Sequence, residues 1–306
     1  MAKKRKYMRA RLGICLIFFL PYFSTFSQPA LPLEEARSRI DSLLQQQKGE
    51  FAIAFEDLQT GKQLFIHERE VFHAASTMKT PVMIELFRQA AGGRFAFSDS
   101  IVIKNEFTSI ADGTKYHLNP VDDSETDLYG HLGEKRTIRD LLYLMITVSS
   151  NFSANLLITL VNPENVTRTM RDLGATDLQV LRGVEDQKAF DKGMNNTLTA
   201  YDLMLIFKKI AKGEAVSASA SQAMITILLD QHFNEIIPAL LPPSVKVAHK
   251  TGSLSGVHHD SGIVFLEDGR KYVLVILSKN LEKEDEAVQA MAKVSEIIYR
   301  YMLHLK

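Results

Sequence analysis

The pattern of apolar residues changes along this 306-residue chain, and the order of those changes restricts the folds that it can adopt. Short apolar or alternating runs bounded by turn residues predict β-strands. Such runs occur near both ends of the chain, at 51–56, 62–67, 245–249, 262–266 and 271–278. The Asp268-Gly269 pair predicts a hairpin between the last two. Strands from both ends are therefore expected to meet in one sheet.

Elsewhere the apolar residues recur at the helical period of about 3.6. This spacing predicts amphipathic helices at the two ends, at 33–47 and about 284–305, and a block of helices between the strands, with Thr137 and Thr199 as N-caps. The order predicts an α/β (α+β) fold, in which a five-stranded antiparallel sheet is flanked by the terminal helices and joined to an all-helical lobe. The sheet lobe is expected at about 33–75 and 245–306, and the helical lobe at about 76–244.

The charge balance excludes one broad class of function. The chain carries 36 lysine and arginine residues against 36 aspartate and glutamate residues, so its formal net charge is zero. A balanced chain has no sequence-wide positive field that would attract a polyanion. We therefore expect no nucleic-acid partner.

The first 27 residues have the pattern of a secretory signal peptide. Basic residues precede an apolar run at 12–23, and Thr25 and Ser27 are small residues suited to a cleavage site after position 27. The mature domain would then span 28–306, be periplasmic or secreted, and have no stable membrane insertion. An uncleaved anchor is the alternative, although spanning a bilayer takes about 20 apolar residues. The only cysteine, Cys15, lies in this segment, so the mature chain has no disulfide, thiol nucleophile or cysteine zinc site.

A serine and a lysine three positions apart open the helix that follows the first strands. Ser76 and Lys79 form an S-x-x-K pattern, and residues at this spacing share one helix face. The amine is therefore expected within hydrogen-bond reach of the hydroxyl, where it could accept the proton and activate the serine. An ordinary N-cap serine gives the same local pattern, so this pair alone is weak support for catalysis.

Two later motifs make the catalytic interpretation much stronger. Ser149-Ser150-Asn151 lies between two predicted helices, and Lys250-Thr251-Gly252 lies at the end of the first strand of the last three. The predicted architecture brings both to Ser76. The order S-x-x-K, S-x-N, K-T-G with these structural settings is difficult to obtain by chance.

These motifs resemble those of the penicillin-recognising serine hydrolases, and most closely those of the class A β-lactamases and their DD-peptidase relatives. The resemblance covers about 33–305 and implies a β-lactamase/transpeptidase-like fold. It also implies that Ser76 is the acyl-accepting nucleophile and that Lys79 is its proton partner. Ser149 would relay a proton to the leaving nitrogen.

The resemblance further implies a set of substrate-binding residues. Asn151 would hold the substrate side chain and Lys79, and Lys250 and Thr251 would bind the substrate carboxylate. The backbone N–H groups of Ser76 and Ser253 would form the oxyanion hole, a feature that is usually a large part of acyl-transfer catalysis. Two lysines close together are also expected to lower the pKa of each amine.

In class A β-lactamases a glutamate after the helical block activates the water that hydrolyses the acyl-enzyme. Glu185 lies at a similar interval from Ser149 and is the candidate for this role, while a plain surface acid in a loop is the alternative. The family has a leucine and an asparagine shortly after the glutamate, whereas this chain has Gln187-Lys188-Ala189-Phe190. Asn195 or Asn196 is the candidate for the missing amide.

Other stretches depart from the family pattern. Ser150 stands where the lactamases usually have aspartate, and the strand after K-T-G has no arginine to help bind a carboxylate. His258-His259-Asp260 occupies that neighbourhood; neighbouring side chains on an extended chain point to opposite sides, so we expect a solvated loop rather than a metal site. The long connection at 98–135, which contains Tyr116 and His117, is expected to form a wall of the substrate cleft.

We therefore predict a monomeric serine hydrolase that needs no cofactor or metal and hydrolyses β-lactams through an acyl-serine. Two alternatives stay open. One is a DD-peptidase, carboxypeptidase or penicillin-binding protein acting on peptidoglycan stem peptides. The other is a binding or sensing module that does not turn over β-lactams.

Overall fold

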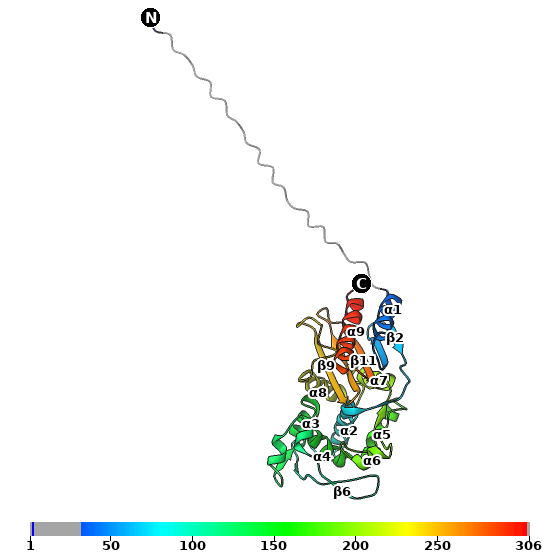
Figure 1. Cartoon of the computed structure of the whole chain (residues 1–306). Coiled ribbons are helices and arrows are strands. Elements are labelled where there is room, and N and C mark those ends of the chain that lie inside the picture. The colour runs from blue at the N-terminus through cyan, green and yellow to red at the C-terminus, as the bar shows by residue number, and fades with distance from the viewer. Residues whose placement is uncertain (1, 3–31, 305–306) are drawn as a thin grey trace.

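The computed structural model describes residue 2 and residues 32–304 of the chain (Figure 1). The predicted signal peptide at 1–27 lies outside the described residues, apart from residue 2. Within the described residues, no helix has both the length and the apolar character that a membrane crossing requires.

A five-stranded antiparallel sheet has the order β2-β1-β11-β10-β9 and is built from both ends of the chain, as predicted. The register places Ile53 opposite Ile276 and Phe55 opposite Leu274 on the adjacent strands β1 and β11. Successive side chains point to opposite faces, so these strands supply apolar residues to both. The strands are β1 (Glu50–Asp57), β2 (Gln63–Ile66), β9 (Lys246–Leu254), β10 (Val257–Phe265) and β11 (Lys271–Lys279).

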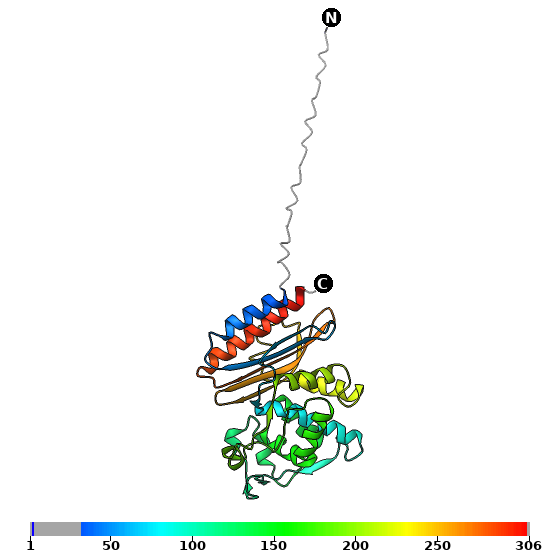
Figure 2. The same cartoon turned by 90° about the vertical axis from the view of Figure 1, so that its right-hand side faces the viewer.

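The terminal helices α1 (Leu33–Leu44) and α9 (Glu284–His304) lie side by side on one face of this sheet (Figure 2). They bury a core with the sheet that includes Ile40, Phe55 and Met291. Full burial of such a side chain stabilises the fold by about 1.5–3 kcal/mol. This arrangement confirms the predicted placement of the two ends of the chain.

The opposite face of the sheet is covered by α7 (Ala200–Ala211) and α8 (Ala218–Leu229), which connect it to the helical lobe. Helix α2 (Lys79–Ala91) is buried over its first two turns and contacts the other helices of this lobe. Those helices are α3 (Ile138–Thr147), α4 (Asn151–Val161) and α5 (Pro163–Asp172), and a short α6 (Gln187–Asp191) follows.

Side-chain caps fix where the helices begin. Thr137 accepts from the backbone N–H of Asp140, and Thr199 accepts from that of Asp202, so both predicted N-caps are confirmed. Ser150 accepts from the backbone N–H of Ser153 and caps α4. A serine can provide this cap as well as an aspartate, which explains how the S-x-N motif keeps its geometry with an uncharged central residue.

Short elements lie between the main helices and strands. The connection at 98–135 contains β4 (Ser100–Val102), β5 (Phe107–Thr108), β6 (Lys115–Tyr116), η2 (Pro120–Asp122) and η3 (Asp127–Gly130), and leads into β7 (Lys135–Thr137). Strand β3 (Phe72–His73) pairs with β8 (Thr197–Leu198) just before the S-x-x-K segment. This pairing anchors the chain on the N-terminal side of Ser76.

The strands β9 and β10 are longer than predicted, and the prediction of a solvated loop at His258-His259-Asp260 is wrong. Both strands continue to a two-residue turn at Ser255-Gly256, where Gly256 has a φ of 72°. His259 and Asp260 are fully buried in β10. Polar residues are tolerated here because each finds a hydrogen-bond partner within the protein.

Candidate active site

Ser76 lies on the 3-10 turn η1 (Ala75–Met78), which leads directly into α2. The edge strand β9 passes very close to this turn. A Cβ atom added to Gly252 would lie 3.0 Å from the backbone nitrogens of both Ser76 and Thr77. The glycine of the K-T-G motif therefore permits the close approach of β9 to the turn that carries the predicted nucleophile.

Lys79 is fully buried one position after this turn. Its Nζ donates to the carbonyl oxygen of Ser149 over 2.5 Å, to the Ser149 hydroxyl over 3.2 Å and to Oδ1 of Asn151 over 2.9 Å. These contacts replace the predicted direct bond to the Ser76 hydroxyl. Burial lowers the pKa of Lys79 to about 7, although the nearby Asp123 and Glu185 carboxylates oppose the shift. Lys79 is therefore able to exchange a proton near neutral pH.

Lys250 is the second buried amine of the site. Its Nζ donates to the Ser149 hydroxyl over 3.0 Å and to the carbonyl oxygen of Thr251 over 2.9 Å. Burial lowers the pKa of Lys250 well below its usual value, and the charge of Lys79 lowers it further. Loss of hydration is the main cause of the lowered pKa of both amines, and the expected effect of one lysine on the other is found at Lys250.

Ser149 therefore lies between two amines. Its backbone adopts a φ of 58°, and Ala75 next to Ser76 has a φ of 44°. Residues other than glycine rarely adopt this conformation, and such residues cluster at functional sites. The strained positions are the predicted catalytic Ser149 itself and the residue directly before Ser76.

Glu185 faces the same site from the other side. Nδ2 of Asn151 donates to Oε1 of Glu185 over 2.8 Å, while Oδ1 of the same residue accepts from Lys79. Burial raises the pKa of Glu185, as do the neighbouring charges of Asp123 and Asp122, while the Asn151 bond and Lys79 oppose this shift. A raised carboxyl pKa gives a stronger base, and Glu185 lines the cavity with a hydrogen-bond partner in Asn151.

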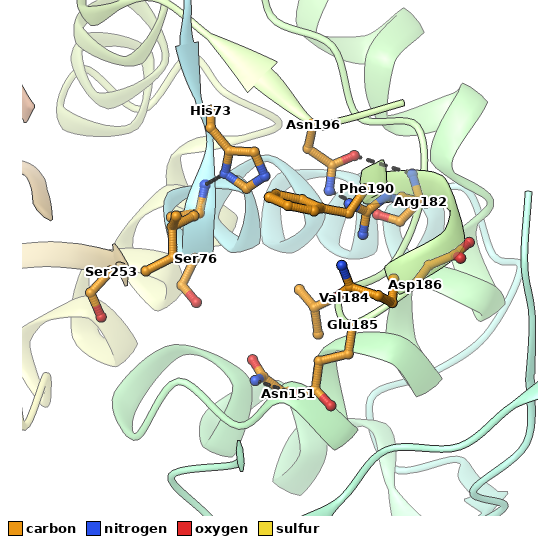
Figure 3. Close-up of a pocket in the computed structure, with 13 residues that line it drawn as sticks. His73, Ser76, Asn151, Arg182, Val184, Glu185, Asp186, Phe190, Asn196 and Ser253 are labelled. Atoms are coloured by element: carbon orange, nitrogen blue, oxygen red, sulfur yellow. Dashed lines mark hydrogen bonds between the residues drawn. The ribbon is translucent and has the colours of Figure 1, made fainter. Parts of the chain in front are cut away.

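A cavity of about 240 Å³ is lined by Ser76, Asn151, Glu185 and Ser253 (Figure 3). Ser76 and Ser253 lie on one side of it, with Asn151 and Glu185 on the other. Phe190 and Val184 supply apolar surface to its wall. A second cleft of about 470 Å³ is shared by Ser76, Ser149, Asn151, Thr251 and Ser253. Ser76, Ser149, Asn151, Glu185, Thr251 and Ser253 therefore line one or both of these clefts. Lys79 and Lys250 are buried and reach the site through their hydrogen bonds to Ser149.

The candidate amides after Glu185 do not reach it. Oδ1 of Asn196 accepts from the backbone N–H groups of Leu181 and Arg182, and Oδ1 of Asn195 accepts from the Arg182 guanidinium. Both asparagines therefore close the loop instead of facing the carboxylate. The expectation that one of them supplies the family's missing amide is wrong.

Asp123 is a residue that the sequence reasoning missed. Its carboxylate accepts from the backbone N–H groups of Asn151 and Phe152 and from the Tyr129 hydroxyl. It therefore holds the start of α4, and with it the Asn151 side chain, in place. No local pattern marks this role, because nothing in the sequence around Asp123 links it to a helix almost thirty residues later.

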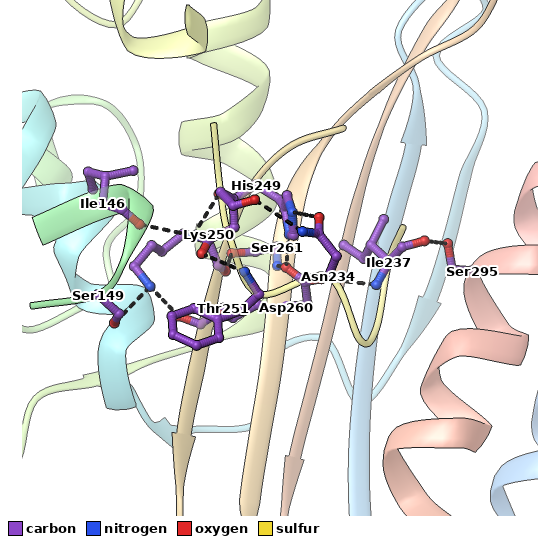
Figure 4. A network of polar contacts seen from close by, with 12 residues as sticks. Ile146, Ser149, Asn234, Ile237, His249, Lys250, Thr251, Asp260, Ser261 and Ser295 are labelled. Carbon is purple, nitrogen blue, oxygen red and sulfur yellow. Dashed lines mark hydrogen bonds and ion pairs between the residues drawn. The ribbon is translucent and has the colours of Figure 1, made fainter. Parts of the chain in front are cut away.

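A buried polar network lies on the sheet face opposite Lys250 (Figure 4). Nδ1 of His249 is 2.9 Å from Oδ1 of Asp260, and Oδ2 of that carboxylate accepts from the backbone N–H of Ile237. The carbonyl oxygen of Ile237 accepts from the Ser295 hydroxyl of α9. The network therefore fastens the K-T-G strand to its neighbour and to the terminal helix.

The two histidines that follow have different surroundings. Nε2 of His258 is 2.7 Å from a carboxylate oxygen of Glu284, whereas Nε2 of His259 is 2.8 Å from the carbonyl oxygen of His73. Their side chains diverge, as the extended backbone requires. Over the described part of the chain, no cluster of three or more histidine, cysteine, aspartate or glutamate side chains is suited to hold a metal ion.

The wall predicted for the long connection is formed by only part of it. Asp122 and Ser124 line the second cleft, whereas Tyr116 packs behind the loop that carries Glu185. The connection therefore contributes to the cleft near α4 and supports the Glu185 loop elsewhere.

Comparison with known proteins agrees with this geometry. The chain is 24% identical over 210 residues to β-lactamase L2 of Stenotrophomonas maltophilia, a match that covers 67% of this chain and 65% of that protein. The fold matches a β-lactamase from Sphaerobacter thermophilus with a TM-score of 0.76 at 24% identity, covering 90% of this chain and 99% of that one.

A mutant of PBP-A, solved as an acyl-enzyme complex with penicillin G, matches with a TM-score of 0.77 at 24% identity over 91% of this chain and 100% of that one. The model of the β-lactamase enzyme family matches residues 35–302. The chain therefore belongs to the β-lactamase enzyme family and is a serine β-lactamase-like hydrolase.

Proposed function

We propose that this protein is a β-lactamase of the class A type, which hydrolyses β-lactam amides through an acyl-Ser76 intermediate. One observation carries the proposal: the side chain of Asn151 contacts both Lys79 and Glu185. The groups needed to form and to release an acyl-serine therefore meet beside Ser76 in one site.

In the proposed acylation, the neutral amine of Lys79 accepts the Ser76 proton as Oγ bonds to the lactam carbonyl carbon. Because Lys79 contacts Ser149 and not Ser76, the proton transfer requires the Ser76 side chain or a water to close this gap. The carbonyl electron pair moves onto oxygen, which the N–H groups of Ser76 and Ser253 stabilise. The carbon–nitrogen bond then breaks, and Ser149 gives its proton to the leaving nitrogen while it recovers one from Lys79. The Ser76 proton is thus transferred to the product amine.

In the proposed deacylation, Glu185 takes a proton from water as the water oxygen bonds to the acyl carbon. The bond between the acyl carbon and Ser76 Oγ then breaks, and Oγ recovers a proton from Glu185. The product is released as a carboxylic acid. The buried environment that raises the pKa of Glu185 favours this base role. Lys250 and Thr251 are proposed to bind the substrate carboxylate in the second cleft.

A DD-peptidase acting on peptidoglycan stem peptides is the second candidate, and one observation favours it. Asn195 and Asn196 hold Arg182 and leave Glu185 without the additional amide that the lactamases use. Slow release of the acyl group would make the protein a peptidase or a β-lactam sensor.

Turnover of a chromogenic cephalosporin by the purified mature protein, followed together with its intact mass, tests these alternatives. Sustained turnover supports the lactamase. A stable adduct on Ser76 without turnover supports the DD-peptidase or sensor, and absence of any adduct contradicts the shared mechanism.

We further propose that the protein acts as a monomer in the periplasm or outside the cell, where it contributes to antibiotic resistance. The signal-peptide pattern at 1–27 supports this location. Expression of the full chain in a susceptible host is expected to raise the inhibitory concentration of a penicillin, and the Ser76→Ala variant is expected to abolish this effect.

A further inference from the structure

The β5–β6 hairpin, residues 107–116, packs against the loop that carries Glu185 on the side away from the cavity. The Ser109 hydroxyl donates to Oδ1 of Asp186 over 2.7 Å, and the backbone N–H of Ile110 donates to Oδ2 over 2.9 Å. Ser109 and Asp186 are both buried. The hairpin tip is therefore bonded to the residue directly after Glu185.

Further bonds join the hairpin to the residues on either side of Glu185. The Tyr116 hydroxyl donates to the carbonyl oxygen of Val184 over 3.2 Å, on the N-terminal side. On the C-terminal side, Nζ of Lys192 donates to the carbonyl oxygen of Ala111 over 3.1 Å. The loop is therefore held on both flanks of Glu185 by one element.

The hairpin is itself fixed to the helical lobe. Asn105 and Leu118 close its base with two hydrogen bonds, from Nδ2 to the Leu118 carbonyl oxygen and from the Leu118 N–H to Oδ1. The buried Phe107 ring lies edge-on to Phe152 of α4, with centroids 6.2 Å apart. Because α4 also carries Asn151 at its first position, the hairpin links the Glu185 loop to the helix that bears its hydrogen-bond partner.

The backbone at Glu185 requires such support. Its φ is 61°, a conformation that is costly for a residue with a side chain. Asp186 also accepts from the backbone N–H of Ala189 and caps the short helix α6. The Asp186 carboxylate thus joins the hairpin, α6 and the strained residue in one buried contact.

We propose that the β5–β6 hairpin positions the Glu185 carboxylate for release of the acyl group, with Ser109 and Asp186 as positioning residues. This inference rests on the proposed role of Glu185 in deacylation. Both residues act through Glu185, because attack by Ser76 on the substrate needs neither the Ser109 hydroxyl nor the Asp186 carboxylate.

The lifetime of the acyl-Ser76 adduct tests the proposal. Full-length mature wild type, Ser109→Ala, Asp186→Asn and Glu185→Gln are each mixed with penicillin G, and adduct decay is followed by intact mass alongside kcat and KM. We expect Ser109→Ala and Asp186→Asn to lengthen the adduct lifetime by about tenfold or more, since small displacements of a catalytic group carry penalties of this order. Slower deacylation lowers kcat and KM together and leaves kcat/KM unchanged.

Lys188→Ala provides the matched control, because its bond to Asp112 also joins the loop to the hairpin but is largely exposed. This variant is expected to behave as the wild type. The hairpin inference is wrong if Glu185→Gln traps the adduct while Ser109→Ala and Asp186→Asn release it at the wild-type rate. It is also wrong if kcat/KM falls as far as kcat in these two variants, since that pattern indicates general damage to the site. If Glu185→Gln releases the adduct as fast as the wild type, the proposed function itself fails.

Discussion

The side-chain amide of Asn151 donates a hydrogen bond from Nδ2 to Glu185 over 2.8 Å, and its Oδ1 accepts one from Lys79. One side chain therefore links the proposed proton acceptor for acylation to the proposed base for deacylation. Its backbone N–H is held by Asp123. The relative positions of the two groups thus depend on the start of α4, which makes the site sensitive to the packing of the helical lobe.

The pH dependence of acylation is expected to follow Lys79. Burial lowers the pKa of this amine to about 7, so it is neutral and able to accept a proton above that pH and charged below it. We expect kcat/KM for a β-lactam to increase with pH through a limb near pH 7, measured over about two pH units on each side. A flat profile across this range would show that Lys79 is not the proton acceptor.

Loss of the Asp260 carboxylate is expected to destabilise the fold. Asp260→Asn replaces the buried carboxylate that contacts Nδ1 of His249 and accepts from the backbone N–H of Ile237, and loss of a buried hydrogen-bond partner costs about 1–3 kcal/mol. Urea unfolding followed by circular dichroism measures this change. Asp268→Asn, on the exposed β10–β11 turn, is the control and should leave the midpoint nearly unchanged. Equal midpoints for the two variants would contradict the structural role of the network.

Gly252→Ala is expected to impair catalysis more than folding. The added Cβ would lie 3.0 Å from the backbone nitrogens of Ser76 and Thr77, so either β9 or the η1 turn must shift. Overpacking of this kind costs about 1–3 kcal/mol, while the oxyanion geometry is lost. The kcat/KM and Tm of Gly252→Ala are compared with those of the control Gly92→Ala, whose added Cβ would make ordinary 3.5 Å contacts. An active Gly252→Ala enzyme would show that this close approach is dispensable.

The sequence was sufficient to predict the sheet, the terminal helices and the cluster of motifs, because these depend on periodicity and on short patterns. The ends of β9 and β10 could not be predicted in the same way. His259 and Asp260 look like loop residues, and only the partners supplied by His73, His249 and Ile237 make their burial tolerable.

Polar contacts between segments far apart in the chain also could not be predicted from the sequence. Asp123 and Asp186 each complete a contact with a segment far away in the chain, and neither has a local pattern that reveals it. Helical spacing predicts a direct Ser76–Lys79 bond, but the Lys79 amine donates instead to three acceptors on Ser149 and Asn151. A buried amine takes the best set of acceptors available, which spacing alone does not reveal.

The central claim is that Glu185 releases the acyl group from Ser76, and its most direct test is the intact mass of Glu185→Gln after mixing with a β-lactam. Glutamine keeps the size of the side chain and its contact with Asn151 but cannot take a proton from water. We predict that this variant forms the Ser76 adduct at the wild-type rate and then remains acylated, with turnover lost. Sustained turnover by Glu185→Gln at the wild-type rate would contradict the account.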